Sequence, residues 1–287
     1  QQAHAERFDP IGTEYFGLHA RFGGEGDGTI GQFPRREDVA GLVREQARRV
    51  DGLPDDEAAL QLRVLPGGDD GRSVAAYDRR TGARVWTALD DKQAYVSPMH
   101  VTIGGVPQLL IVSASRILGL GLDRHDVLWE FPWSTNHDAS AAQPIVIGGE
   151  RVFFSSGYGT GAAVFGLVRA GDRFDILPVW RNIRMKNRQS SSVVRDGFIY
   201  GLDEGILACV DAATGALQWK GGRYGHGQLL LAGGHLVVIT EDGDLVLVAA
   251  TPEKLQEMAR VPAIEGETWN VPAFAGGILL VRNTSEM

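Results

Sequence analysis

The stretch Asp78-Arg79-Arg80-Thr81-Gly82-Ala83-Arg84-Val85-Trp86 recurs, in the pattern Asp-x-x-Thr-Gly-x-x-x-Trp, as Asp211-Ala212-Ala213-Thr214-Gly215-Ala216-Leu217-Gln218-Trp219. At ordinary residue frequencies, four fixed residues in nine match by chance at on the order of one in several hundred thousand start positions. Two matches in one chain therefore indicate an internal repeat. A repeat restricts the fold more strongly than any single predicted element does.

The motif describes a strand, a tight turn and a returning strand. The Asp carboxylate can accept hydrogen bonds from the backbone N–H groups that follow it, and the Gly supplies the positive φ of the reversal. The Trp lies on the returning strand, where its ring can bury ~150–250 Å² between neighbouring sheets. The spacings between Trp86, Trp129, Trp180 and Trp219 are 43, 51 and 39 residues. These spacings match one four-stranded propeller blade.

A second repeated phrase sets the phase of the blades. It is a short apolar strand that ends in a Gly-containing hairpin turn, and it precedes a second apolar strand. Its copies are His100–Gly105, Pro144–Gly149, Ser192–Gly197, Leu229–Gly234 and Pro272–Gly277. The predicted fold is all-β, a β-propeller of four-stranded antiparallel blades with Trp-docking motifs. About four repeats are clear, and the last blade is expected to be incomplete at the C-terminus, because Gly276–Met287 stops where a third strand should begin.

Residues 1–72 fit the repeat poorly. They contain no Trp, although several Gly residues punctuate them as turns would. In Pro34–Val50, apolar residues recur at helical spacing, so an amphipathic helix and an irregular blade segment are equally compatible with the pattern. Asp55–Leu65 either continues that helix or enters the first clear blade. We therefore expect residues 1–72 to form one or two degenerate blades with a helical insertion, and residues 73–287 to form the clear blades.

Composition narrows the class of protein. The formal net charge of −8 and the pI near 5.4 argue against a nucleic-acid-binding protein, which normally has a basic face. No apolar run approaches the ~20 residues that a membrane-spanning helix needs, so no membrane span is expected. The single cysteine, Cys209, rules out an intramolecular disulfide and disfavours a cysteine-based metal site. We expect it to be a small buried side chain on a strand.

The Asp-x-x-Thr-Gly-x-x-x-Trp turn resembles the tryptophan-docking motif of the pyrroloquinoline-quinone (PQQ) repeat β-propellers. The resemblance covers roughly residues 70–287. Three further segments are similar to the PQQ-like repeat proteins of bacterial secretomes: Ser155–Gly161, Asp196–Gly201 and Glu241–Leu245. The superfamily includes the quinoprotein alcohol dehydrogenases and a non-enzymatic outer-membrane assembly lipoprotein. The motif is therefore specific for the fold and much less specific for function.

The resemblance also implies which cofactor-binding and catalytic residues an enzyme of this family would need. The quinoprotein dehydrogenases cover the cofactor with a ring of two adjacent disulfide-bonded cysteines, bind Ca²⁺ through a Glu and an Asn, and use an Asp as base. This chain has no Cys-Cys pair. Asn136 and Asp138, on either side of His137, are the nearest approach to a polar cofactor cluster, and turn chemistry explains them better. We expect no catalytic residue, no metal and no cofactor.

Candidate binding residues lie just before each inner strand, because in a propeller these positions converge around the central axis. Several of them are aromatic, cationic or His, which suits an anionic small molecule, a glycan or a peptide. Solvent-facing caps of the strands would show the same residue types. The candidates are Asn136, His137, Lys186, Arg188, Tyr224, His226, Trp269 and Asn270, with Tyr95, Ser97, Asn187 and Gln189 beside them.

The predicted function is that of a non-catalytic propeller scaffold that binds a protein or a small ligand. The resemblance implies a periplasmic or secreted location. The alternative is a diverged PQQ-dependent oxidoreductase that uses PQQ with calcium. An incomplete last blade would leave an unpaired strand edge, which adds pairing at that edge as a further expected contact.

Overall fold

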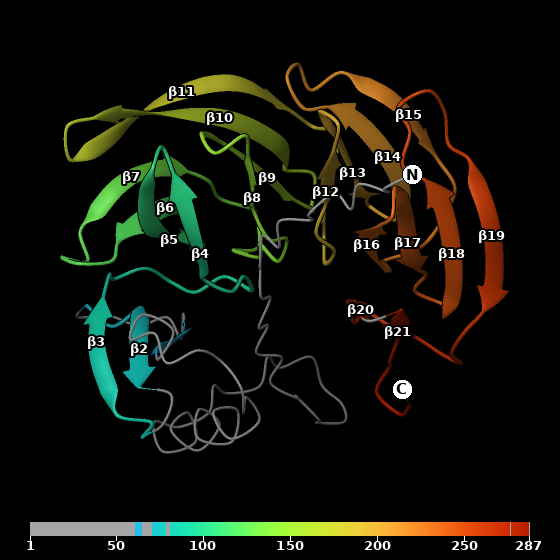
Figure 1. The fold of residues 1–287 in the computed structure, drawn as a ribbon, viewed down its shortest axis with the longest axis horizontal. Coiled ribbons are helices and arrows are strands. Elements are labelled where there is room, and N and C mark those ends of the chain that lie inside the picture. Colours follow the sequence, from blue (N-terminus) through green and yellow to red (C-terminus); the bar gives the residue numbers. More distant parts are fainter. Residues whose placement is uncertain (1–60, 65–70, 79–80, 276, 287) are drawn as a thin grey trace, which may run out of the picture.

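The computed structural model describes residues 61–64, 71–78, 81–275 and 277–286. Within these ranges every regular element is a β-strand, and the strands form antiparallel sheets arranged in a ring (Figure 1). Four of the sheets have four strands each, and strands that follow one another in the chain are neighbours in each sheet. The β-propeller predicted from the repeat is confirmed.

Each four-stranded blade runs from the centre of the ring outward in chain order (Figure 1). The first contains β4 (Met99–Ile103), β5 (Val106–Val112), β6 (Arg116–Gly121) and β7 (Val127–Pro132). The second contains β8 (Ile145–Ile147), β9 (Arg151–Ser156), β10 (Gly161–Ala170) and β11 (Arg173–Asn182). The third contains β12 (Val193–Arg195), β13 (Phe198–Asp203), β14 (Ile206–Asp211) and β15 (Leu217–Gly221). The fourth contains β16 (Gln228–Ala232), β17 (His235–Ile239), β18 (Asp244–Ala249) and β19 (Glu257–Pro262).

Two smaller sheets flank these blades. One contains β1 (Gln61–Val64), β2 (Val74–Asp78) and β3 (Arg84–Ala88), and the other contains β20 (Ala273–Ala275) and β21 (Ile278–Leu280). β1 lies within the segment 1–72 that we expected to be degenerate, and it pairs with β2. The helical insertion predicted over residues 34–50 lies outside the described residues.

Two-residue turns close the first hairpin of three of the four-stranded blades, and the turn between β8 and β9 has a third residue, Glu150. The first two residues of all four turns have positive φ. In the two-residue turns this is what type I′ requires, and type I′ matches the twist of the flanking strands. The pairs are Gly104–Gly105, Gly148–Gly149, Asp196–Gly197 and Gly233–Gly234. The second repeated phrase of the sequence is therefore the inner hairpin of a blade.

The Thr-Gly turn has the predicted local chemistry. The Asp211 carboxylate accepts the backbone N–H of Thr214 at 2.8 Å and its hydroxyl at 2.9 Å. Gly215 has a φ of +71°. A Cβ at Gly215 would lie 2.7 Å from the Trp180 ring, which belongs to the preceding blade. The turn is therefore shaped both for the chain reversal and for the close approach of a neighbouring Trp.

A non-glycine residue takes the same place in the blade β4–β7. His125 lies four residues before Trp129, as Gly215 lies four before Trp219, and it adopts a φ of +57°. Its ring stacks on Trp86 of the preceding sheet, with ring centroids 4.1 Å apart. Each of these Trp rings therefore packs on the turn of the next blade, and this contact links consecutive blades.

The hydrophobic core lies between the faces of neighbouring blades. One cluster joins blades β4–β7 and β8–β11, and another joins blades β12–β15 and β16–β19. Cys209 is fully buried in the second cluster, as predicted. The Trp219 indole donates its N–H to the Thr251 carbonyl of the next blade at 2.8 Å.

The hairpin β10–β11 differs from the other outer hairpins. The segment between Asp172 and Trp180 lengthens β11, and both strands of this hairpin have ten residues. Phe174 near the hairpin tip is buried in the cluster shared with blade β4–β7. Its ring lies on the inner turn of that blade, where a Cβ at Gly104 would be 2.9 Å from it. The hairpin therefore clamps two blades together.

Candidate functional site

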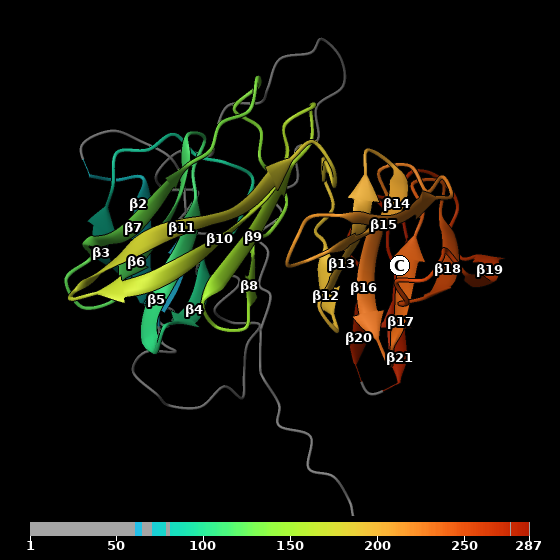
Figure 2. The same cartoon turned by 90° about the horizontal axis from the view of Figure 1, so that it is seen from above.

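The candidate site lies on one face of the ring, which we call the loop face. Antiparallel strands alternate in direction, so the connections between blades and the turn between the second and third strand of each blade emerge on this same face. The turns of the inner hairpins, of which Gly104–Gly105 is the first, lie on the opposite face. Figure 2 shows the ring from the side, with these two faces at opposite edges.

A row of touching side chains begins on the blade β8–β11. His137, in the connection before β8, packs edge-to-face on Tyr158 of the β9–β10 turn, with ring centroids 5.0 Å apart. The Arg188 guanidinium, in the connection before β12, lies over the Tyr158 ring, 4.8 Å from its centroid. This cation–π contact joins two blades across their connecting loops.

The row continues onto the next two sheets. An Arg188 Nη atom lies 3.3 Å from His226 Nε2, in the connection before β16. The backbone N–H of His226 donates to Glu241 of the β17–β18 turn at 3.0 Å, and the Trp269 indole N–H donates to the other Glu241 oxygen at 2.8 Å. We call this row the loop-face belt. Its members are His137, Tyr158, Arg188, His226, Glu241 and Trp269.

Glu241 is the anionic link of the belt. The backbone N–H of His226 lowers the pKa of the Glu241 carboxyl below its ordinary value, and the Trp269 N–H adds to this effect against partial desolvation. The carboxylate is therefore charged at neutral pH, with its oxygens held by donors from the connections before β16 and β20. Trp269 keeps 45% of its surface exposed. Its ring is consequently positioned and still available to a partner.

A second polar cluster lies beside the belt on the blade β12–β15. The buried Asp203 carboxylate forms ion pairs with two lysines. Its oxygens lie 2.7 Å from Lys186 Nζ and 2.6 Å from Lys220 Nζ. Burial alone would raise the pKa of Asp203, but the hydrogen bonds from both lysines lower it below its ordinary value. Glu204 lies 3.7 Å from the Lys186 ammonium. Two of the four lysines of the chain therefore share one buried carboxylate.

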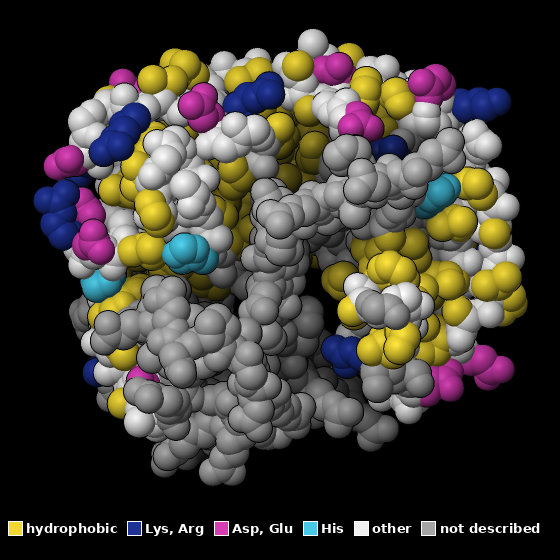
Figure 3. Space-filling model, viewed as in Figure 1, with side chains coloured by type: hydrophobic (Ala, Val, Ile, Leu, Met, Phe, Trp, Pro, Cys, Tyr) yellow, Lys and Arg dark blue, Asp and Glu magenta, His cyan; other side chains and the backbone are white. Residues whose placement is uncertain are grey.

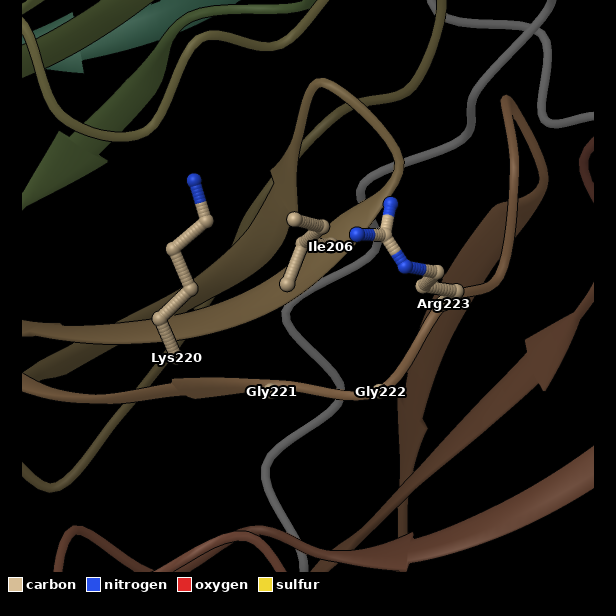
Figure 4. Close-up of a pocket in the computed structure, with 5 residues that line it drawn as sticks. All are labelled: Ile206, Lys220, Gly221, Gly222 and Arg223. Carbon is tan, nitrogen blue, oxygen red and sulfur yellow. The ribbon is translucent and has the colours of Figure 1, made fainter.

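A shallow hollow of about 400 Å³ opens next to this cluster. Its lining residues are Ile206, Lys220, Gly221, Gly222 and Arg223. Figure 4 shows Lys220 and Arg223 on either side of Ile206, with both side chains pointing to the same side of the strand that carries the two glycines.

The other sequence candidates have different surroundings. Tyr224, expected on the mouth of the channel, is instead buried at 1% exposure in the core between blades. Its hydroxyl lies 3.1 Å from Glu257, and burial raises its pKa to about 12. The expectation is wrong because the glycines around Tyr224 let the loop turn the ring inward onto Gly222. Asn136 is exposed, and the Asn270 amide donates to the Arg282 carbonyl at 3.4 Å.

The sequence candidates include four of the six belt residues and lack the other two, Tyr158 and Glu241, as well as Asp203 of the second polar cluster. The missed residues lie at the turns between second and third strands. Strand alternation places these turns on the same face as the connections between blades. Counting the predicted strands along each blade would therefore have placed these turns on the same face.

Comparisons with known proteins identify the family. Residues 58–221, more than half of the chain, match the family model described as outer membrane protein assembly factor BamB. The chain belongs to this family of PQQ-repeat β-propellers.

Two solved structures were compared with the chain. BamB from Moraxella catarrhalis aligns with a TM-score of 0.44 and 14% identity, over 73% of this chain and 78% of that chain. A functionally unknown protein from Desulfotomaculum acetoxidans DSM 771 aligns with a TM-score of 0.47 and 8% identity, over 67% and 64% of the two chains. No curated protein sequence matches the chain.

The residues of this BamB-family chain do not fit PQQ in the manner of the quinoprotein dehydrogenases. Cys209, the only cysteine, is buried in β14, where it pairs with Trp219 of β15 and Tyr200 of β13, and burial raises its pKa to about 12. It cannot form the ring of adjacent cysteines. Among the described residues, no group of three or more His, Cys, Asp or Glu side chains is placed to hold a metal ion. The described part of the chain also has no helix long and apolar enough to cross a membrane.

Proposed function

We propose that this member of the BamB family is a non-catalytic scaffold that binds a protein partner through its loop face. The loop-face belt carries the proposal, because six residues from consecutive sheets contact one another in one row across the connections between blades. Trp, Tyr and Arg are the residues that most often dominate protein–protein binding energy. The belt holds one of each in fixed geometry, so little side-chain entropy remains to be lost on binding.

The family supports a protein as the partner, since the matched model describes an assembly factor. We extend from it only this general role. The resemblance also supports a periplasmic or secreted location, which fractionation of the producing cells would test. A small anionic ligand or a glycan on the same face is the runner-up, because the belt includes a cation and stacked rings.

Site-specific photo-crosslinking tests the proposal. A benzoylphenylalanine at Tyr95, which is 63% exposed in the connection before β4, probes the loop face. The same residue at Glu150, in the β8–β9 turn, probes the opposite face. We expect the Tyr95 probe to capture a defined protein in the producing cells, and the double variant Arg188→Ala/Trp269→Ala to abolish this capture. Capture by the Glu150 probe alone would overturn the proposal. So would capture by the Tyr95 probe that is unchanged in the double variant.

Calorimetric titration with PQQ and Ca²⁺ tests the alternative oxidoreductase. The scaffold proposal predicts no heat of binding. Stoichiometric binding would instead support a quinoprotein and would redirect attention to the carboxylates of the loop face.

A further inference from the structure

The loop face is locally basic around the blade β12–β15, although the whole chain has a formal charge of −8. Five cationic side chains gather there with three carboxylates. The cations are Arg184, Lys186, Arg188, Lys220 and Arg223, and the carboxylates are Asp203, Glu204 and Glu241. Shared contacts link them, because Lys186 and Lys220 both bind Asp203 and Arg188 contacts His226, three residues after Arg223.

Two of these cations line the hollow beside β15. Lys220 and Arg223 stand on its two sides, and the wall between them is the bare backbone of Gly221 and Gly222 (Figure 4). Gly222 has a φ of +66°, and a Cβ there would lie 2.5 Å from the Tyr224 ring. No other residue fits that position without strain, so bare backbone forms this wall of the hollow.

The two cations differ in their availability. Lys220 is tied to Asp203, and that bond uses one of its three N–H donors. Arg223 is exposed, and its guanidinium has no hydrogen bond or ion pair to another described residue. A guanidinium presents a planar fork of N–H groups that matches a carboxylate in two parallel hydrogen bonds.

We propose that this hollow binds a carboxylate side chain, Asp or Glu, of an extended acidic segment in the protein partner. Arg223 receives the carboxylate through two hydrogen bonds, Lys220 supplies a second charge, and Ile206 contacts the aliphatic part of the side chain. The inference rests on the proposed function, because the hollow adjoins the loop-face belt that the partner would cover.

The surroundings favour a short acidic segment over a long polyanion. Glu204 lies beside Lys186, and Glu241 lies beside His226, so carboxylates border the basic area on two sides. A continuous polyanion would meet these carboxylates and the net negative charge of the chain. A short acidic segment can place one carboxylate in the hollow without reaching these carboxylates, and the residues on either side of the segment can lie on the belt.

Fluorescence anisotropy of the full chain with a labelled oligoglutamate peptide tests the inference. We expect salt-sensitive binding that Arg223→Gln weakens about tenfold, as the loss of one charge-assisted hydrogen bond pair predicts. Arg223→Lys should restore only part of the affinity, because an ammonium lacks the fork. Lys254→Gln is the matched control, since it removes the same charge from the exposed β18–β19 turn on the opposite face. An oligoglutamine peptide controls for the backbone.

Two results would overturn the inference. One is equal binding of oligoglutamate by the Arg223→Gln and Lys254→Gln variants. The other is tighter, equally Arg223-dependent binding of heparin, which would assign the hollow to polyanions. Either result leaves the crosslinking test of the loop face intact. If the Tyr95 probe captures no partner but the peptide still binds in an Arg223-dependent way, the proposed function is wrong and the carboxylate site stands.

Discussion

At the scale of single residues, Trp219 holds two blades together. Its ring is 8% exposed, and its N–H bonds the Thr251 carbonyl of the next blade. We expect Trp219→Ala to lower the free energy of unfolding by ~3–5 kcal/mol, as buried Trp-to-Ala changes do. Denaturant unfolding would measure it. Trp269→Ala is the control, because that ring is half exposed, and a similar loss in both variants would contradict the assigned role.

Asp203 makes the stability of the folded state depend on pH in the acid range. Its pKa is lowered in the folded state from the ordinary value of 3.8, so its stabilisation is complete above that pH and is lost as pH falls through the lower folded value. Asp203→Asn should cost ~3 kcal/mol at neutral pH, because it leaves two partly buried ammonium groups without their carboxylate. Thermal melts between pH 2 and pH 7 would show a flatter acid limb in the variant. An unchanged acid limb would contradict this account.

At the scale of elements, the hairpin β10–β11 is the departure from the repeat. Phe174 fixes it to the blade β4–β7 by covering the turn at Gly104. We expect Phe174→Ala to destabilise the chain by ~3 kcal/mol and to increase hydrogen exchange in β10, β11 and β4 together. Leu177→Ala on the exposed side of β11 should change neither quantity by a comparable amount. Exchange confined to the hairpin tip would show that it does not clamp the two blades.

At the scale of the whole molecule, apolar side chains gather over β20 and β21 (Figure 3). Val271, Phe274, Ile278 and Leu280 are all exposed there. Exposed apolar patches and unpaired strand edges promote association. We expect the chain to self-associate at high concentration, and Phe274→Ser/Ile278→Ser to reduce this association in analytical ultracentrifugation. Val179→Ser on β11 is the control, and a wild-type chain that stays monomeric would contradict the prediction.

The repeat was enough to predict the propeller and the phase of its strands. The inner hairpins, the Thr-Gly turn and the Trp strand depend on residues within about ten positions of one another. Gly215 at positive φ and Cys209 in the core follow from such local patterns. Strand alternation makes the face of each turn a local property too. The residue types and the periodicity of the sequence therefore carried the architecture of the blades.

The composition of the loop-face belt depended on contacts between blades. Whether Arg188 reaches Tyr158 and His226, or Tyr224 turns inward, is decided by the spacing between sheets and by the side chains that fill it. These residues are 30 to 38 positions apart, so no local pattern records their distance. The long hairpin has the same origin, because Phe174 is stabilised by a blade that precedes it in the chain. Local turn chemistry determined the fold, and packing between distant segments determined the site.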